Sequence, residues 1–391
     1  MESKWFGPIK IEAKSGTDYN LSVVGFHPSG KIYVVYVAGK DIIIGSYDNE
    51  KMVAHKNLSE TGLMCYTPFL HICKNGYIHV VWIEAEGLGA DKQVIKYRYH
   101  DGVDWSEVVT VKEMKIKGVL PGGFVDRKVE DMRMAADENN NIFIALNKWP
   151  AGRCTFISKY IGAETKEEGW PMDGRSKHPD VAVGAGHVHL AWQQMWGKKY
   201  TIAYCRRVNV PTAKWESPID AGPADHRPRI TIDSDNLRHI IMMADSSGTR
   251  IIYYKHYMKD GFSPPITITD RARAYYNTCI NVLDKNNVLI SDSSGSAFFY
   301  NWMQNGKWSG HTQLPTGKMR SKFVTSDLSP TGRGAIAIID NYNGVYLFTN
   351  DGIVPPPDPE PVPDPIPTPV PEPIPRSCSH PGAGTRAWAC V

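Results

Sequence analysis

The chain has 391 residues, of which 42% are hydrophobic and 22% are charged, and its formal net charge is +3. This length and composition allow a large buried core, and the near-neutral charge argues against nucleic acid as a partner. No apolar run of about 18 residues or more predicts a membrane span. Residues 1–8 lack the basic and apolar regions of a secretory signal, so no signal peptide is visible.

The chain has seven cysteines, and five of them lie in or beside apolar, strand-like runs: Cys65, Cys73, Cys154, Cys205 and Cys279. A buried reduced thiol behaves as a small hydrophobe, so we expect these five to be inert core residues. No paired cysteine or histidine spacing of the zinc type appears. The sequence therefore predicts neither a metal nor a cofactor.

The first predicted strand begins at Trp5. Its sequence, Trp5-Phe-Gly-Pro-Ile, has the same aromatic, proline and isoleucine positions as Trp215-Glu-Ser-Pro-Ile and Phe262-Ser-Pro-Pro-Ile. Those two segments end repeats that lie further along the chain. The N-terminal strand is thus predicted to belong to a repeat whose other strands lie elsewhere.

An apolar strand recurs along the chain. Its clearest copies begin at Gly30, with Gly30-Lys-Ile-Tyr-Val-Val-Tyr, at Gly76, with Gly76-Tyr-Ile-His-Val-Val-Trp, and at Gly186, with Gly186-His-Val-His-Leu-Ala-Trp. Looser copies begin at Asn141, Leu237, Asn287 and Gly334. The copies lie about 45 to 65 residues apart. A short strand before most copies, an aromatic strand after them and a final tryptophan-led strand make a unit of four short strands, typical of a β-propeller blade.

The last repeat lacks a fourth strand of its own. It begins near Lys322, runs through Val345-Tyr-Leu-Phe to the turn Asn350-Asp-Gly, and then meets a proline-rich segment. The strand at Trp5 can complete this blade and remove an exposed sheet edge, which would otherwise invite aggregation. We therefore predict an all-β, seven-bladed β-propeller over residues 1–353, closed by its N-terminal strand.

The composition changes abruptly after Val354, because nearly every second residue from 355 to 375 is proline. Proline lacks a backbone donor and fixes φ, so residues 354–375 are predicted to form an extended polyproline II stalk. A flexible linker is the alternative. Either form would hold the propeller away from whatever the C-terminus attaches to.

The C-terminal tail, residues 376–391, carries Cys378 and Cys390 on either side of a loop that contains glycine and proline. A disulfide between these two cysteines is sterically reasonable in an oxidising compartment, and a crosslink to another chain is the alternative. We expect the tail to anchor the chain to a protein scaffold or capsid.

Several repeat motifs carry a family resemblance. The best copies are His178-Pro-Asp-Val, Gly186-His-Val-His-Leu-Ala-Trp and Trp215-Glu-Ser-Pro, while Asp101-Gly-Val-Asp-Trp and Asn305-Gly-Lys-Trp keep the end of an Asp box. In these motifs the chain resembles the Asp-box, or bacterial-neuraminidase-repeat, propellers of sialidases, and also the propellers of ulvan-type polysaccharide lyases. The resemblance covers residues 1 to about 353. The shared motifs belong to the scaffold and say nothing of catalysis, and a sialidase arginine triad with its tyrosine and acid partner is not found in the sequence. The resemblance to ulvan-type lyases favours a lyase as one of the possible functions.

Residues just before the innermost strands of a propeller converge around one mouth of its central channel. The guanidinium group of arginine binds a carboxylate or a sulfate through two parallel hydrogen bonds. Tyrosine offers a flat apolar face with a hydroxyl group. The mouth is therefore predicted to bind an anionic or hydroxyl-rich glycan, and its predicted ligand-binding residues are Tyr19, Tyr66, Arg133, His178, Arg227, Tyr276, Arg320 and Lys322. The alternative is that these side chains only plug the channel and satisfy strand ends.

Two functions fit these features. In the first, the propeller binds a cell-surface glycan or serves as an interaction platform on its stalk, either as a virion fibre or decoration protein or as a surface adhesin, and is extracellular or on the virion surface. In the second, the chain is a polysaccharide lyase that acts on an acidic polysaccharide by β-elimination, with His178, His226, Arg227 and Tyr276 as its catalytic residues. The low specificity of the site motifs favours binding over catalysis.

Overall fold

The computed structural model describes residues 5–12, 22–48, 51–87, 90, 92–115, 129–148, 153–171, 175–222, 226–246, 249–258, 261–272, 278–294, 297–317, 319, 323–340 and 344–350. The chain divides into two units, Met1–Ile353 and Val354–Val391. The predicted stalk and tail, with Cys378 and Cys390, lie outside the described residues. In the described part of the chain, no helix is long and apolar enough to cross a membrane.

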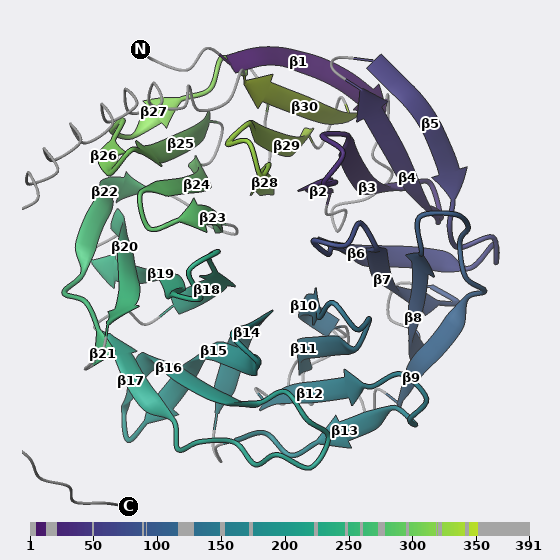
Figure 1. The fold of residues 1–391 in the computed structure, drawn as a ribbon, viewed down its shortest axis with the longest axis horizontal. Helices are drawn as coiled ribbons and strands as arrows, with labels where there is room; N and C mark the ends of the chain where they lie inside the picture. The colour runs from purple at the N-terminus through teal and green to yellow at the C-terminus, as the bar shows by residue number, and fades with distance from the viewer. Residues whose placement is uncertain are drawn as a thin grey trace, which may run out of the picture. The chain divides into compact units, whose positions relative to one another are not determined.

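The strands form seven sheets arranged as blades around a central channel, with one strand of each sheet innermost (Figure 1). Blade 1 contains β2 (Val23–Phe26), β3 (Ile32–Ala38), β4 (Asp41–Asp48) and β5 (Lys51–Asn57). Blade 2 contains β6 (Met64–Ile72), β7 (Ile78–Ala85), β8 (Lys92–His100) and β9 (Val109–Lys115). Blade 3 contains β10 (Val129–Ala136), β11 (Ile142–Lys148), β12 (Arg153–Lys159) and β13 (Lys166–Glu168).

The strands of the remaining four blades are also named from the channel outward. Blade 4 contains β14 (Ser176–Gly184), β15 (His187–Trp196), β16 (Lys199–Val208) and β17 (Ile219–Gly222). Blade 5 contains β18 (His226–Ile232), β19 (Arg238–Ser246), β20 (Thr249–Met258), β21 (Gly261–Phe262) and β22 (Ile266–Ala272). Blade 6 contains β23 (Thr278–Asp284), β24 (Asn287–Ser294), β25 (Ala297–Gln304), β26 (Lys307–Trp308) and β27 (Thr312–Gln313), and blade 7 contains β28 (Val324–Leu328), β29 (Gly334–Asp340), β30 (Gly344–Asn350) and β1 (Trp5–Glu12). In blades 5 and 6, two strands share the outer edge, because β21 and β22 both pair with β20, and β26 and β27 both pair with β25.

The predicted closure by the N-terminal strand is confirmed. Strand β1 pairs antiparallel with β30, with Trp5 opposite Asn350 and Ile9 opposite Leu347. Figure 1 shows β1 along the outer edge of blade 7. Because β1 covers the outer edge of β30, the first and last parts of the propeller are joined in one sheet.

The aromatic residues that end the repeats join blades 4, 5, 6 and 7 each to the preceding blade. Their ring centroids lie 5.1 to 5.7 Å from aromatic rings of that blade, in the pairs Trp5–Trp302, Trp215–Phe156, Phe262–Tyr204 and Trp308–Tyr254. The outermost strand of blade 4 begins later than predicted, at Ile219. Pro218 precedes it, and proline cannot donate a hydrogen bond to a neighbouring strand.

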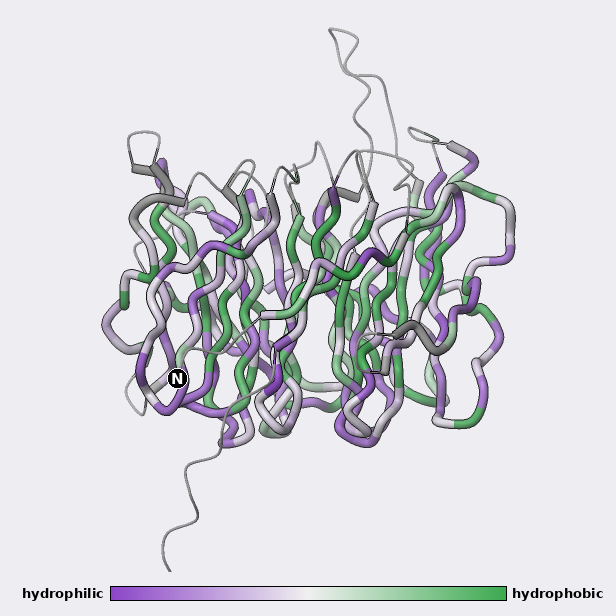
Figure 2. Tube along the Cα trace, turned by 90° about the horizontal axis from the view of Figure 1, so that it is seen from above, coloured by the Kyte–Doolittle hydropathy of each residue, from purple (hydrophilic) through white to green (hydrophobic). Residues whose placement is uncertain are grey.

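The apolar residues form separate clusters between neighbouring blades, and they run along the strands through the middle of the propeller (Figure 2). The recurring strand contributes Trp82 and Trp192, which are fully buried. Each indole nitrogen donates a hydrogen bond to the side chain two residues later, Glu84 at 3.0 Å and Gln194 at 2.7 Å. The five propeller cysteines form no disulfide, and burial raises the pKa of the thiols, to about 12 for Cys65.

Candidate functional site

Three innermost strands share one irregularity at the mouth, where these strands begin. In β6, β14 and β18 the pairing register shifts at a residue that precedes proline, namely Thr67, His178 or Arg227. These residues have φ values of 52°, 49° and 39°, in a region that L side chains rarely adopt. Such β-bulges redirect side chains away from the regular alternation of a strand.

The bulge in β14 places His178 in contact with two neighbouring blades. Its Nδ1 makes a short hydrogen bond with Oδ2 of Asp131 on β10 of blade 3. Its ring also lies edge-on to the ring of His226 on β18 of blade 5, with 4.9 Å between centroids. One carboxylate and two imidazoles from three blades therefore meet at the mouth.

The electrostatic environment keeps Asp131 ionised. Burial alone would raise the pKa of this carboxyl, but His178, Arg227 and Arg133 together hold it well below its usual value. An ionised carboxylate accepts the hydrogen bond, so Nδ1 of His178 carries a proton.

A second layer of charged side chains lies two residues further along β10, β14 and β18. Arg133 Nε on β10 is 3.8 Å from Oδ1 of Asp180 on β14, and the other carboxylate oxygen accepts a hydrogen bond from the backbone nitrogen of Ile230 at 2.8 Å. The guanidinium of Arg133 also lies 5.4 Å from the ring centre of Phe69. Burial lowers the pKa of Arg229 to about 10, so this arginine remains charged at neutral pH.

In the described part of the chain, these two layers contain three arginines and two aspartates. Arg133, Arg227 and Arg229 are each less than a tenth exposed. The charged groups that act on Arg229 are these other two arginines and the carboxylates of Asp131 and Asp180. Buried charge is stabilised mainly by opposite charge and hydrogen bonds. Guanidinium groups bind carboxylate and sulfate oxygens through paired hydrogen bonds, so these side chains suit an anionic ligand.

A buried amide flanks Asp131. Asn147 on β11 lies directly opposite Asp131 in the register of the two strands. Its side chain is fully buried, and within the described ranges neither its amide nitrogen nor its amide oxygen has a hydrogen-bond partner. A buried amide without partners is unfavourable and can be satisfied by a ligand.

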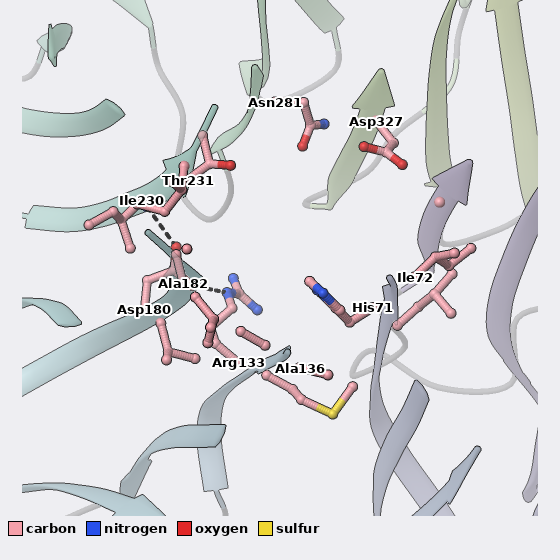
Figure 3. A pocket seen from close by; sticks show the side chains of 18 of the residues that line it. His71, Ile72, Arg133, Ala136, Asp180, Ala182, Ile230, Thr231, Asn281 and Asp327 are labelled. Carbon is pink, nitrogen blue, oxygen red and sulfur yellow. Dashed lines mark hydrogen bonds and ion pairs between the residues drawn. The ribbon is translucent and has the colours of Figure 1, made fainter. Parts of the chain in front are cut away.

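Beneath the mouth, the channel encloses a cavity of about 570 Å³ that reaches the turns after the innermost strands. Figure 3 shows His71 and Arg133 on one side of it and Asn281 and Asp327 on another. Burial lowers the pKa of His71 to about 4 and raises the pKa of Asp327 to about 7. Within the described part of the chain, no three histidine, cysteine or acidic side chains are grouped to hold a metal ion.

The structure brings together four of the predicted site residues, Arg133, His178, His226 and Arg227. Tyr66 is 2% exposed and packs in the apolar cluster between blades 2 and 3. The other predicted residues, Tyr19, Tyr276, Arg320 and Lys322, lie outside the described residues.

Sequence reasoning missed Asp180, Arg229 and Asn147. The first two follow the prolines of His178-Pro-Asp and Arg227-Pro-Arg, so a polar residue on each side of proline was the available signal.

The fold is shared with several solved structures at low sequence identity. An ulvan lyase of polysaccharide lyase family PL25, bound to -[GlcA(1-4)Rha3S]-, aligns with a TM-score of 0.56 and 11% identity over 88% of this chain and 95% of that chain. The propeller domain of Cps50 (Swd1) from Myceliophteria thermophila aligns with a TM-score of 0.52 and 11% identity over 89% and 99%. The NanB sialidase from Streptococcus pneumoniae aligns with a TM-score of 0.50 and 10% identity over 85% of each chain.

No protein-family model matches the chain, and no curated protein matches it. The chain is thus a seven-bladed β-propeller, similar in fold to ulvan lyases and to NanB sialidase. At such low identity the likeness extends to the fold alone.

Proposed function

We propose that the mouth of the propeller binds an acidic glycan through a carboxylate or sulfate group. The observation that carries this proposal is the convergence of Arg133, Arg227 and Arg229 with His178 and His226, against two carboxylates. Arginine binds carboxylate and sulfate oxygens through parallel hydrogen bonds, and such bonds are stronger away from water. An acidic sugar is therefore the class of ligand that these side chains suit.

Two proteins with the same fold support an acidic glycan as ligand. The ulvan lyase is bound to -[GlcA(1-4)Rha3S]-, whose sugars carry a carboxylate and a sulfate, and NanB is a sialidase. The NanB structure holds 2-[(3-chlorobenzyl)ammonio]ethanesulfonate, a sulfonate, so both structures contain a ligand with an anionic group. The residue types at the mouth of this chain suit the same class of ligand.

Calorimetric titration of the full chain tests the proposal. A glucuronate-containing oligosaccharide is compared with a neutral oligosaccharide of equal length, using the wild type, Arg227→Gln and Arg206→Gln. Arg206 pairs with Glu216 on blade 4, so its substitution removes the same charge elsewhere. We expect Arg227→Gln alone to weaken binding of the acidic ligand about tenfold or more, because hydrogen bonds to charged groups contribute roughly 1.5 to 3 kcal/mol. Equal affinity of Arg227→Gln and wild type would show that the mouth is not the site.

The contact between Asp131 and His178 favours a second candidate function, β-elimination of a uronate-containing polysaccharide. A carboxylate that orients an imidazole is the arrangement of a general base. The C5 proton would pass to Nε2 of His178, the electron pair would form the C4–C5 double bond, and the C4–O bond would break. Arg227 would neutralise the uronate carboxylate, and His226 or Tyr276 would protonate the leaving oxygen.

The two candidates differ in one product. Incubation with uronate-containing polysaccharides yields an unsaturated sugar that absorbs ultraviolet light only if elimination occurs. In that case, His178→Ala should abolish the signal while Arg206→Gln retains it. Binding without any unsaturated product leaves the binding function and removes the lyase.

We also propose that residues 354–375 act as a stalk and residues 376–391 as an anchor that displays the propeller on a virion or cell surface. The regular prolines of the first segment and the two cysteines of the second support this arrangement. A chain that ends at residue 353 should bind glycan normally but fail to assemble. Normal assembly of that shortened chain would remove the anchor.

A further inference from the structure

A second pocket lies between blades 2 and 3, at the end of the propeller opposite the mouth. Its volume is about 300 Å³, and its lining includes Tyr77, Tyr97 and Tyr99 from blade 2 and Ile142 and Lys159 from blade 3. The innermost strands begin at the mouth, and neighbouring strands in each blade are antiparallel. The start of β7, the end of β8 and the end of β12 therefore all lie at the opposite end.

Tyrosine rings form one wall of this pocket. The centroid of Tyr99 lies 6.4 Å from that of Tyr77 and 6.1 Å from that of Tyr97, with interplanar angles of 23° and 25°. The planes of neighbouring rings are therefore nearly parallel. His79 Nδ1 is 2.7 Å from the hydroxyl of Tyr97 and fixes that ring from within the blade.

The same position between blades 4 and 5 explains why this pocket is open. There the histidine–tyrosine pair recurs, with His189 Nδ1 2.9 Å from the hydroxyl of Tyr204. Arg238, the first residue of β19, lies over the ring of Tyr257 at 4.4 Å and hydrogen-bonds to Tyr204. The first residue of β11 is Ile142, which cannot reach across the gap in this way.

The polar groups of the pocket balance in charge. Lys159 contributes an ammonium group, whose closest described partner is the carbonyl oxygen of Ala163 at 3.5 Å. Asp101 contributes an exposed carboxylate that accepts backbone hydrogen bonds from Val103 and Asp104, both at 2.9 Å. A flat aromatic wall beside a few polar groups suits a ligand that has an apolar face and hydroxyl groups at its edge.

We propose that this pocket binds one neutral pyranose unit of a glycan, independently of the mouth. The apolar face of the sugar ring packs on Tyr77 and Tyr99, while Asp101 and Lys159 hydrogen-bond to its hydroxyl groups. The volume matches the lower end of small-molecule sites. The proposal concerns a different face, a different set of residues and a neutral ligand, so it does not depend on the acidic glycan at the mouth.

Saturation-transfer NMR on the full chain tests this site with a panel of neutral methyl pyranosides, the glucoside, galactoside, mannoside and rhamnoside. We expect transfer from the protein to the sugar for at least one of them. Tyr99→Ala should weaken binding about two- to twelvefold, because an aromatic contact contributes roughly 0.5 to 1.5 kcal/mol. Ile142→Arg should block the pocket, because Arg238 occupies the corresponding position between blades 4 and 5.

Matched variants separate this site from other effects. Tyr253→Ala removes a half-buried tyrosine of blade 5, and Arg227→Gln alters the mouth, so both should keep the transfer. If Ile142→Arg does not fold, Asp101→Ala changes an exposed side chain of the pocket and should still weaken binding. Absence of transfer from every sugar, or transfer that survives Tyr99→Ala and disappears in Arg227→Gln, would overturn the proposal.

Discussion

Deletion of residues 1–12 is expected to destabilise the whole propeller, because β1 forms the outer edge of blade 7. The deletion exposes the pairing edge of β30 and removes Ile9 and Ile11 from the apolar cluster shared by blades 7 and 1. It also removes Trp5, which lies 5.2 Å from Tyr300 and 5.7 Å from Trp302 of blade 6. Partial burial of two isoleucines and one tryptophan corresponds to on the order of 5 kcal/mol, close to the whole stability of many domains.

Thermal unfolding followed by circular dichroism measures this effect. We expect the midpoint to fall by about 10 °C or more, and to rise again when a synthetic peptide of the deleted residues is added, because a ligand of the native state stabilises it. Deletion of residues 355–391 is the control and should leave the midpoint unchanged. An unchanged midpoint after loss of residues 1–12 would refute closure by the N-terminal strand.

Three further outcomes are expected. Burial raises the pKa of Asp327 from 3.8 to about 7, so its contribution to stability is present below about pH 4 and is lost as pH rises through 7. Urea unfolding should show a loss on the order of 3 kcal/mol between pH 5 and pH 8, and Asp327→Asn should remove it. Gly184→Ala should destabilise the propeller by about 1 to 3 kcal/mol in the same assay, because its Cβ would lie 2.5 Å from Ile232, whereas Gly169→Ala meets no atom within 4 Å. Non-reducing mass spectrometry should find Cys378 and Cys390 oxidised, and free thiols at both would contradict the predicted anchor.

The architecture of the propeller was accessible from the sequence because each blade repeats the same buried strand. The aromatic, proline and isoleucine pattern shared by Trp5 and Trp215 also identified the closing strand, since both tryptophans pack on the preceding blade. The start of the outermost strands was less accessible. Pro218 delays pairing until Ile219, because proline has no backbone donor.

The candidate site was only partly predictable, since its geometry depends on β-bulges. The positions of His178 and Arg227 at strand starts indicated that they approach the mouth. A bulge inserts one extra residue, so the side chains beyond it point to the opposite face of the strand. The sequence alone therefore did not show that Asp180 and Arg229 also belong to this cluster. The pocket between blades 2 and 3 was equally hidden, because it depends on how side chains from two blades pack against each other.

The most direct test of the account is a crystal structure of the chain with a glucuronate-containing oligosaccharide. We predict that the sugar carboxylate lies within hydrogen-bond distance of Arg227 at the mouth, next to His178 and His226. A ligand bound elsewhere on the propeller, with the mouth unchanged, would contradict the proposed function.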